Sequence, residues 1–449
     1  MQQLVRAGIE GDGRPVNLPA RRSGPAAGDR SRSVVSSNDR PVGHNQETAR
    51  CNAVPYQRLA ARLGVAHPAK PAIACDATQP TERRPRPGIP YCSMLMVIFG
   101  AGASYDSLVD ISVGYPDRDL RPPLANQLFG RRGVFEAAVQ EYGECRPIIP
   151  QLRQLTQDTN LEKVLEALRA EGEYDDQRHV QLHAVRYYLR NVIEVCSNLW
   201  PAETRGVTNY SNLLDRIRNW CVRSREPVAF VTFNYDTMLE AACSDVYGFV
   251  PTNIHSYISR DDFQVFKPHG SINWVRAVAG NVGMLETANQ SQIAHALIRQ
   301  GKKLDLLPGQ HLVSSGDPGI LEGHYTYPAI ALPVETKNEF EFPDAHLKKL
   351  RDVIPEVTRV LIIGWRGTEE HFLKLWLESG PPPVNRMWLE SGGWRGNRKV
   401  LVVSGSPTEA QQVTARLGVP LQGQFVNAPG GFSWLVTSGA SELHKLLAD

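Results

Sequence analysis

Two polar side chains, Asn234 and Asp236, stand directly after the apolar run 228–233 (VAFVTF), where a buried strand is expected to end. They are two positions apart, so in an extended segment their side chains would share one face. A neutral amide can hold an ester, an amide or a water molecule, and a carboxylate can bind a ribose hydroxyl or stabilise developing positive charge. The alternative is that both residues, Asp236 above all, only cap the helix that is predicted to follow.

A candidate general base, His269, lies further along the chain in the sequence KPHGS. It stands between a rigid and a permissive residue, Pro268 and Gly270, which favour a loop rather than a helix. The imidazole titrates near neutral pH, which suits proton transfer. The alternative role for a single histidine is a structural hydrogen bond.

Two glycine-containing turns follow other apolar runs. Gly100 and Gly102 come after residues 94–99 in the sequence GAGAS, and Gly405 comes after residues 399–403 in VVSGS. Such glycines let the backbone turn and approach a phosphate, and Ser104 would add a hydroxyl at a helix start. The first turn lacks the third glycine of the dinucleotide-binding fingerprint, so by itself it does not establish nucleotide binding.

The elements that must position these residues can be traced from the apolar runs. The runs 94–99, 228–233, 359–365 and 399–406 each lead into a polar turn and a helix. This alternation predicts an α/β fold, a Rossmann-like parallel sheet with helices on both faces. Helical periodicity between the first run and the Asn-x-Asp strand predicts a helical insertion at about 121–226. Residues 275–330 are predicted to be a loop-rich excursion, which is either a lid or contact surface or an ordinary long connection.

Composition limits the function classes. Residues 1–93 carry 14 Lys+Arg against 7 Asp+Glu and are rich in Pro, Gly and Ser, so we expect a disordered basic extension before a folded part at 94–449. That folded part is mildly acidic, which makes direct nucleic-acid binding there unexpected. The seven cysteines form no Cys-x-x-Cys pair. No membrane span or signal peptide is evident, and we expect a cytoplasmic protein with reduced thiols and no zinc.

Taken together, these stretches resemble the sirtuin superfamily, in the order that this family uses, from about residue 94 to about residue 418. The resemblance implies that NAD is bound as the substrate across the strand ends, with its nicotinamide beside the Asn-x-Asp turn. The motifs that match are GAGAS, TFNYD, KPHGS, LIIGW and VVSGS, and they imply NAD contacts by Gly100, Ala101, Gly102, Ser104, Gly364, Ser404 and Gly405.

The chain also departs from sirtuin deacylases. It has no cysteine after Cys243, so the resemblance does not extend to the zinc module or to the acyl-peptide groove built on it. The stretch GYPDRD (114–119) replaces the usual Gly-Ile-Pro-Asp-Phe-Arg and carries Asp117 and Arg118 over as NAD contacts. The stretches RPPLANQLF, TFNYDTMLE and HGSINW look like the zinc-less sirtuin-like domains of bacterial antiphage defence. That likeness implies NAD hydrolysis, regulated by homo-oligomerisation or by a partner such as a hexameric DNA-translocating ATPase.

The resulting hypothesis is an NAD hydrolase that depletes NAD when activated. Asn234 would position the ribose and the attacking water, His269 would act as general base, and Asp236 would shape the nicotinamide pocket. Sirtuin-type deacylation or ADP-ribosylation and a non-catalytic NAD sensor remain open. A plain dehydrogenase is disfavoured, because no acidic residue stands at a strand end about 20 positions after the first glycine turn.

Overall fold

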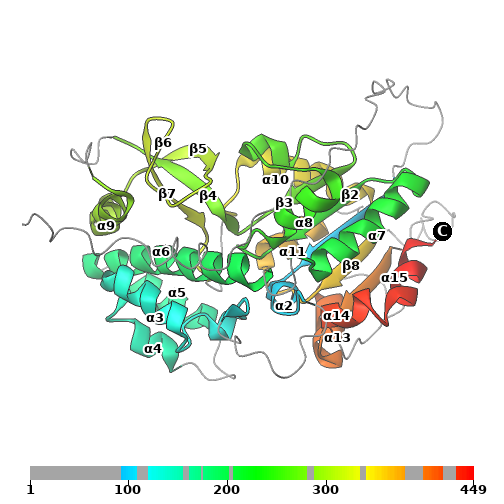
Figure 1. Ribbon diagram of the computed structural model, residues 1–449, viewed down its shortest axis with the longest axis horizontal. Coiled ribbons are helices and arrows are strands. Elements are labelled where there is room, and N and C mark those ends of the chain that lie inside the picture. Colours follow the sequence, from blue (N-terminus) through cyan, green and yellow to red (C-terminus); the bar gives the residue numbers. More distant parts are fainter. Residues whose placement is uncertain are drawn as a thin grey trace, which may run out of the picture. The chain divides into compact units, whose positions relative to one another are not determined.

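Five parallel strands form the central sheet, in the order β3-β2-β1-β8-β9 (Figure 1). Every residue of the first two strands in the chain is buried, as expected for parallel strands covered on both faces. This confirms the predicted Rossmann-like α/β fold. The strands are β1 (Met94–Phe99), β2 (Val228–Thr232), β3 (Phe263–Phe266), β8 (Val357–Ile363) and β9 (Lys399–Val403).

The computed structural model describes residues 93–108, 120–154, 161–172, 175–201, 206–280, 288–333, 340–379, 398–417 and 431–448. The predicted basic extension lies outside these residues except for Ser93, and so do Asp117 and Arg118. Residues 85–449 form one compact unit. Among the described residues, no helix is both long and apolar enough to cross a membrane.

Helices cover both faces of the parallel sheet. The strand order grows outward from β1 in both directions, and right-handed crossovers therefore place α7 and α8 on one face and α10 and α11 on the other. The chain after β9 returns with α14, which packs against α2 and α7. The helices of this part are α2 (Ala101–Tyr105), α7 (Asn209–Ser224), α8 (Met238–Tyr247), α10 (Asp344–Val353), α11 (Glu370–Ser379), α13 (Pro407–Arg416), α14 (Gly431–Val436) and α15 (Ala440–Leu447).

The predicted helical insertion after β1 is present, and its buried side chains form a second hydrophobic core together with buried residues of the segment 272–332. Its long helix α6 (Asp176–Leu199) runs between three shorter helices and a second sheet (Figure 1). The shorter helices are α3 (Gly133–Glu141), α4 (Ile149–Arg153) and α5 (Leu161–Gly172). Although α7 falls within the predicted bounds of the insertion, it packs on the parallel sheet through Tyr210, Leu213 and Ile217, which belong to the first core.

Residues 275–330 differ from the loop-rich excursion that the sequence predicts. They contribute to a four-stranded antiparallel sheet of order β5-β4-β7-β6, together with one helix. This sheet gains its stability from cross-strand pairs and from the packing of two of its strands on α6, which local sequence does not reveal. The elements are β4 (Gly270–Val278), α9 (Gln290–Gln300), β5 (Leu306–Val313), β6 (Ile320–Leu321) and β7 (His324–Ile330).

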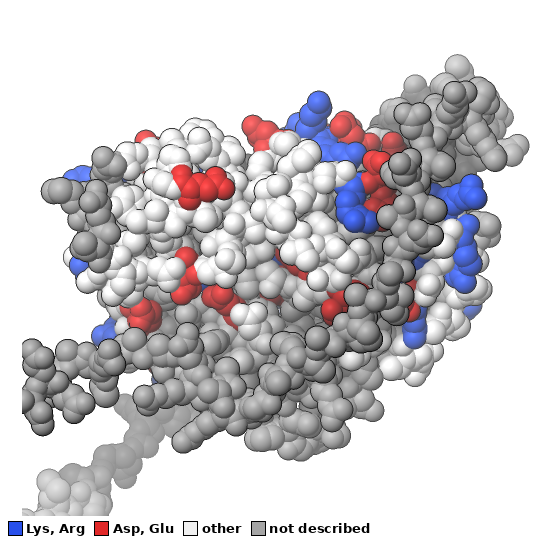
Figure 2. All heavy atoms as spheres, turned by 45° about the horizontal axis from the view of Figure 1, so that its top comes forward, with Lys and Arg blue, Asp and Glu red and all other residues white. Residues whose placement is uncertain are grey.

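Charges on the described surface are mixed. On the face shown in Figure 2, acidic and basic side chains are both scattered among uncharged ones. The described residues on this face form no continuous basic stripe of the kind that binds nucleic acid. This agrees with the mildly acidic composition of residues 94–449.

Candidate functional site

A cavity of about 770 Å³ lies at the carboxyl ends of the parallel strands. Open α/β sheets bind ligands at this edge, because the turns that follow the strands meet there. Every predicted site residue that the structure describes lines this cavity: Gly100, Ala101, Gly102, Ser104, Asn234, Asp236, His269, Gly364, Ser404 and Gly405.

The glycines after β1 and β8 are required by the packing of one turn on the other. The amide of Gly100 donates to the Ile363 carbonyl at 3.0 Å, and that of Gly102 donates to the Gly364 carbonyl at 3.1 Å. A Cβ on Gly100 would lie 2.5 Å from the Gly364 carbonyl oxygen. Gly364 has φ +60° and leaves no room for a Cβ beside the backbone nitrogen of Ala103. Close backbone approach therefore explains these glycines without a ligand.

Gly405 is different, since a Cβ there would meet no atom within 4 Å. We expect Gly364→Ala to lower the free energy of unfolding by about 2–4 kcal/mol, from left-handed strain and overpacking. Gly405→Ala should change it by less than about 0.5 kcal/mol. Urea unfolding of the two variants beside the parent chain measures both values. Equal destabilisation would show that the packing argument is wrong.

The amide of Asn234 is oriented by three oxygens. Its Nδ2 donates to the Gly100 carbonyl at 2.9 Å, to Ser104 Oγ at 2.9 Å and to the Tyr210 hydroxyl at 3.2 Å. A carbonyl can only accept, so this network assigns the amide nitrogen to that side. The Asn234 Oδ1 has no hydrogen-bond partner among the described residues, and it is the acceptor that this buried side chain offers to the cavity.

Hydrogen bonds to the Ser104 hydroxyl link Asp236 to Asn234. The Ser104 hydroxyl donates to Asp236 Oδ2 at 2.6 Å, so the two polar side chains after β2 do converge on one point, as their spacing predicts. The second carboxylate oxygen accepts the backbone N–H of Met238 at 3.0 Å, at the start of α8. Asp236 therefore also accepts the first N–H of α8, one residue before the N-cap Thr237, and its contact with a ligand stays a prediction. The hydroxyl of Ser104, predicted to contact a pyrophosphate, is engaged in this network instead.

Sequence reasoning missed Tyr210, whose hydroxyl completes the network. It lies 2.9 Å from Ser104 Oγ, and because the serine proton goes to Asp236, Tyr210 is the donor. Burial, followed by the charge of Asp236, raises the pKa of Tyr210 well above its usual value, so the phenol stays protonated. In the sequence Tyr210 is indistinguishable from the apolar residues of its helix.

The tautomer of His269 follows from its backbone partner. Its Nδ1 lies 3.2 Å from the Phe233 carbonyl, which can only accept, so Nδ1 carries the proton. In the neutral ring Nε2 is then the basic nitrogen. The ring is buried and lines the cavity, and its centroid lies 5.0 Å from that of Phe233 and 6.0 Å from that of Tyr235.

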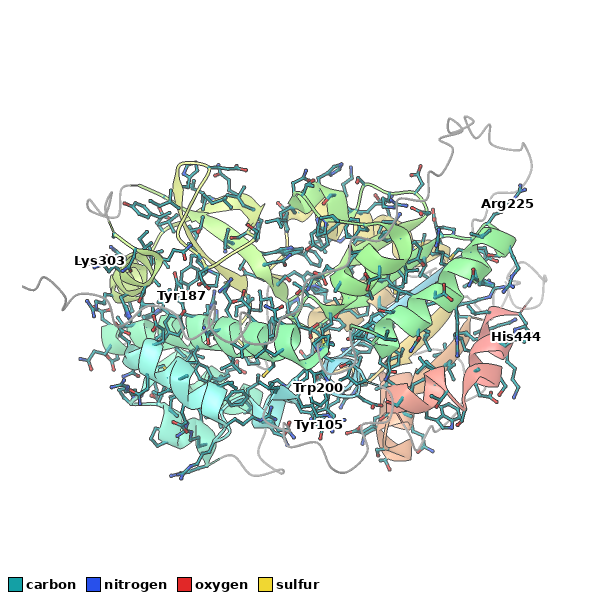
Figure 3. All side chains as sticks on the ribbon, in the orientation of Figure 1. Tyr105, Tyr187, Trp200, Arg225, Lys303 and His444 are labelled. Atoms are coloured by element: carbon teal, nitrogen blue, oxygen red, sulfur yellow. The ribbon has the colours of Figure 1, made fainter. Side chains whose placement is uncertain are left out.

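A second residue that the sequence did not reveal is Arg121, at the start of the RPPLANQLF stretch. Its Nε donates to the Tyr105 carbonyl at 2.7 Å, and its guanidinium lies 3.9 Å from the centre of the Tyr105 ring. Trp200, at the end of α6, lies near Tyr105 (Figure 3), and its ring centre is 5.9 Å from the same guanidinium. Within the described residues the two terminal nitrogens of Arg121 make no hydrogen bond, and the residue lines the cavity. A guanidinium held in this way can donate two parallel hydrogen bonds to an anion.

Carboxylates line other parts of the cavity. Burial raises the pKa of Asp106, although hydrogen bonds from Ser433 and the charge of Arg121 act in the opposite direction. Near the end of β9, Glu409 accepts the hydroxyl of Ser404 at 3.0 Å. These acidic groups provide hydrogen-bond acceptors for hydroxyl groups of a ligand.

Comparison with protein-family models and with curated proteins finds no match to this chain. The resemblance to sirtuins therefore depends on the five motifs of the sequence, and the five strand ends that carry them share one edge of the sheet.

Proposed function

We propose that this protein is an NAD hydrolase that cleaves the nicotinamide–ribose bond, giving nicotinamide and ADP-ribose. The observation that carries the proposal is the pairing of an oriented amide with an oriented imidazole: Asn234 and His269 line the same cavity as the glycine turn after β1. Nicotinamide in NAD is already a good leaving group, so the protein needs chiefly to orient the ribose, admit one water and accept its proton.

Each residue has a role that follows from its contacts. The Oδ1 of Asn234 accepts a hydrogen bond from the attacking water or from a ribose hydroxyl. The Nε2 of His269 takes the proton that the water loses when its oxygen bonds to the anomeric carbon. Asp236 places a negative charge near the ribose, where positive charge develops as the glycosidic bond breaks. Tyr210 and Ser104 keep Asn234 in its orientation.

The diphosphate of NAD needs compensating charge, and Arg121 supplies it in this proposal. The glycine turns bring backbone close to the same space, and the adenosine would extend toward Gly364, Ser404 and Gly405, where Glu409 can accept ribose hydroxyls. The predicted contacts of Asp117 and Arg118 lie outside the described residues and stay predictions.

Arg121→Gln is expected to raise KM for NAD about 10- to 100-fold, because a charge-assisted hydrogen bond is worth about 1.5–3 kcal/mol. The change in kcat should be small, since the phosphates are remote from the bond that breaks. Steady-state rates at two salt concentrations would measure the effect and its electrostatic part. Arg131→Gln is the matched control, since Arg131 is exposed and does not line the cavity. A KM within twofold of the parent value for Arg121→Gln would contradict this role.

The direct test of the proposed function is to incubate the purified chain with NAD and to quantify nicotinamide and ADP-ribose. Hydrolysis requires equal amounts of the two products. Release of nicotinamide with transfer of labelled ADP-ribose to protein would identify a transferase, and deacylation would need an acylated peptide. Tight NAD binding by the folded protein with no release would favour a sensor.

The proposal extends to biological role through the sirtuin resemblance alone. An enzyme that destroys NAD must be held inactive until needed, and we propose an effector of bacterial antiphage defence, regulated by self-association or by a hexameric DNA-translocating ATPase. The isolated chain should therefore be assayed over a range of concentrations, because activity that depends on assembly rises faster than linearly with concentration.

A further inference from the structure

A buried ion pair lies next to the cavity and is not used by the mechanism above. Lys267 is fully buried, Glu240 is 5 % exposed, and Lys267 Nζ lies 2.7 Å from Glu240 Oε1. The Tyr257 hydroxyl donates to the same carboxylate oxygen at 3.3 Å. A buried charge is costly unless it is paired, and a buried pair is often no more stabilising than apolar side chains of the same size. The stability of the fold therefore does not account for this pair.

The second partner of Lys267 connects it to the candidate site. Its Nζ also donates to the backbone carbonyl of Asp236, in the turn that carries Asn234. Lys267 itself begins the turn that carries His269. One buried side chain thus joins the Asn-Tyr-Asp turn (residues 234–236) to the Lys-Pro-His turn (residues 267–269).

Further hydrogen bonds join residues 233–235 to residues 269–272, and in one of them the Ser271 hydroxyl donates to the Tyr235 carbonyl at 3.3 Å. His269 Nδ1 donates to the Phe233 carbonyl at 3.2 Å, and the amide of Ile272 donates to the Tyr235 carbonyl at 2.9 Å. The carbonyls of Phe233, Tyr235 and Asp236 are therefore all bound by donors from the segment that follows β3. A shift of either turn would break the bond that sets the His269 tautomer.

We propose that Lys267, neutralised by Glu240, is a positioning residue that holds the Asn-Tyr-Asp turn against the Lys-Pro-His turn, so that Asn234 and His269 act on the same substrate. The proposal rests on the proposed NAD hydrolysis for its kinetic consequence. It assigns to the ion pair a role in geometry, with its effect on kcat rather than on substrate affinity.

The experiment separates this role from a purely structural one with paired substitutions. Lys267→Met alone leaves Glu240 buried without its partner and should lower Tm. Lys267→Met/Glu240→Met removes both charges, and its Tm should return to within a few degrees of the parent value, but no donor reaches the Asp236 carbonyl. We expect the double variant to keep KM for NAD within threefold and to lose about 10- to 100-fold in kcat, as for a misplaced catalytic group.

The matched control is a second largely buried ion pair at the other end of the sheet. The Nη1 of Arg359 lies 2.7 Å from Glu226 Oε2, and Arg359 pairs in register with Leu95 near the start of β1, away from the cavity. Arg359→Met/Glu226→Met should keep the parent kcat. A Lys267→Met/Glu240→Met variant that is folded and retains at least half of the parent kcat would overturn the proposal. A rise in KM that accounts for the whole loss would also overturn it, because that result indicates a damaged binding site.

A second readout needs no turnover and distinguishes a wrong positioning role from a wrong proposed function. Imidazole ¹⁵N spectra, with the His269 signal assigned by its loss in His269→Asn, report which ring nitrogen carries the proton. The parent chain and the Arg359 control should show His269 in the Nδ1–H form, and the Lys267 double variant should show both tautomers. If the parent chain releases no nicotinamide, this spectrum decides: an unchanged His269 signal in the double variant overturns the positioning role.

Discussion

Nicotinamide release from NAD is expected to fall by about 10²–10³-fold when Asn234 is replaced by alanine, the loss that follows removal of one preorganised polar group in an active site. The substitution removes Oδ1, the acceptor that would hold the water or the ribose. It also leaves the Gly100 carbonyl and two hydroxyls without their shared donor. The loss should lie mainly in kcat, because the adenosine and diphosphate contacts remain.

Asn234→Asp sharpens this test. It keeps an acceptor oxygen but places a second oxygen 2.9 Å from the Gly100 carbonyl, where the structure requires a donor. We expect it to be about as inactive as the alanine variant, which would show that the orientation of the amide matters. Asn219→Ala is the matched control, since Asn219 is exposed on α7 and its side-chain amide donates to Asp215 on the same helix. A folded Asn234→Ala protein that keeps more than about a tenth of the parent rate would contradict the role of Asn234 in holding the water or the ribose, since loss of a preorganised polar group predicts a larger fall in rate.

His269→Asn is expected to lower kcat by about 10²–10⁴-fold, the usual contribution of a general base. Asparagine is the informative replacement, because its amide nitrogen can take the place of Nδ1 and still donate to the Phe233 carbonyl. What is lost is the basic nitrogen. The parent kcat/KM should fall as the pH is lowered and the imidazole becomes protonated, since imidazolium cannot accept a proton. The residual activity of the variant should lack that fall.

The measurement is a pH–rate profile of nicotinamide release for the parent chain and the variant. His444→Asn is the control, because His444 is exposed on α15, far from Tyr105 at the cavity (Figure 3). If His269→Asn lowers the rate but leaves the fall at low pH in place, another group is the base. If His269→Ala and Asn234→Ala both keep full NAD cleavage, the catalytic site is elsewhere.

Much of the fold and of the cavity is determined by short stretches of the sequence. The apolar runs of β1, β2, β8 and β9 are long enough to identify buried strands, and the polar or glycine residues after them mark the ends. Because the carboxyl ends of parallel strands share one edge of a sheet, the residues in those turns had to meet. This is why ten predicted residues from five separate motifs line one cavity.

The groups that orient these residues were decided only by the tertiary structure. Tyr210 is 106 positions from Ser104, and it is a core residue by any local pattern, yet its hydroxyl reaches the network because α7 packs beside α2 and β2. The position of the Arg121 guanidinium depends on contacts with Tyr105 and Trp200. The tautomer of His269 depends on a carbonyl 36 positions away.

The same distinction explains the antiparallel sheet. Strand β5 has no fully buried residue and β6 has two residues, and the sheet exists because β4 pairs with β5 and β7, β6 pairs with β7, and β4 and β7 pack on α6. The spacing of apolar residues along the chain indicates which residues are buried, so it predicts the helices and strands that pack on a sheet. It does not record which polar atom a neighbouring segment presents. The sequence alone therefore determined where the candidate chemistry is gathered, and only the packing of distant segments decided how each group is aimed.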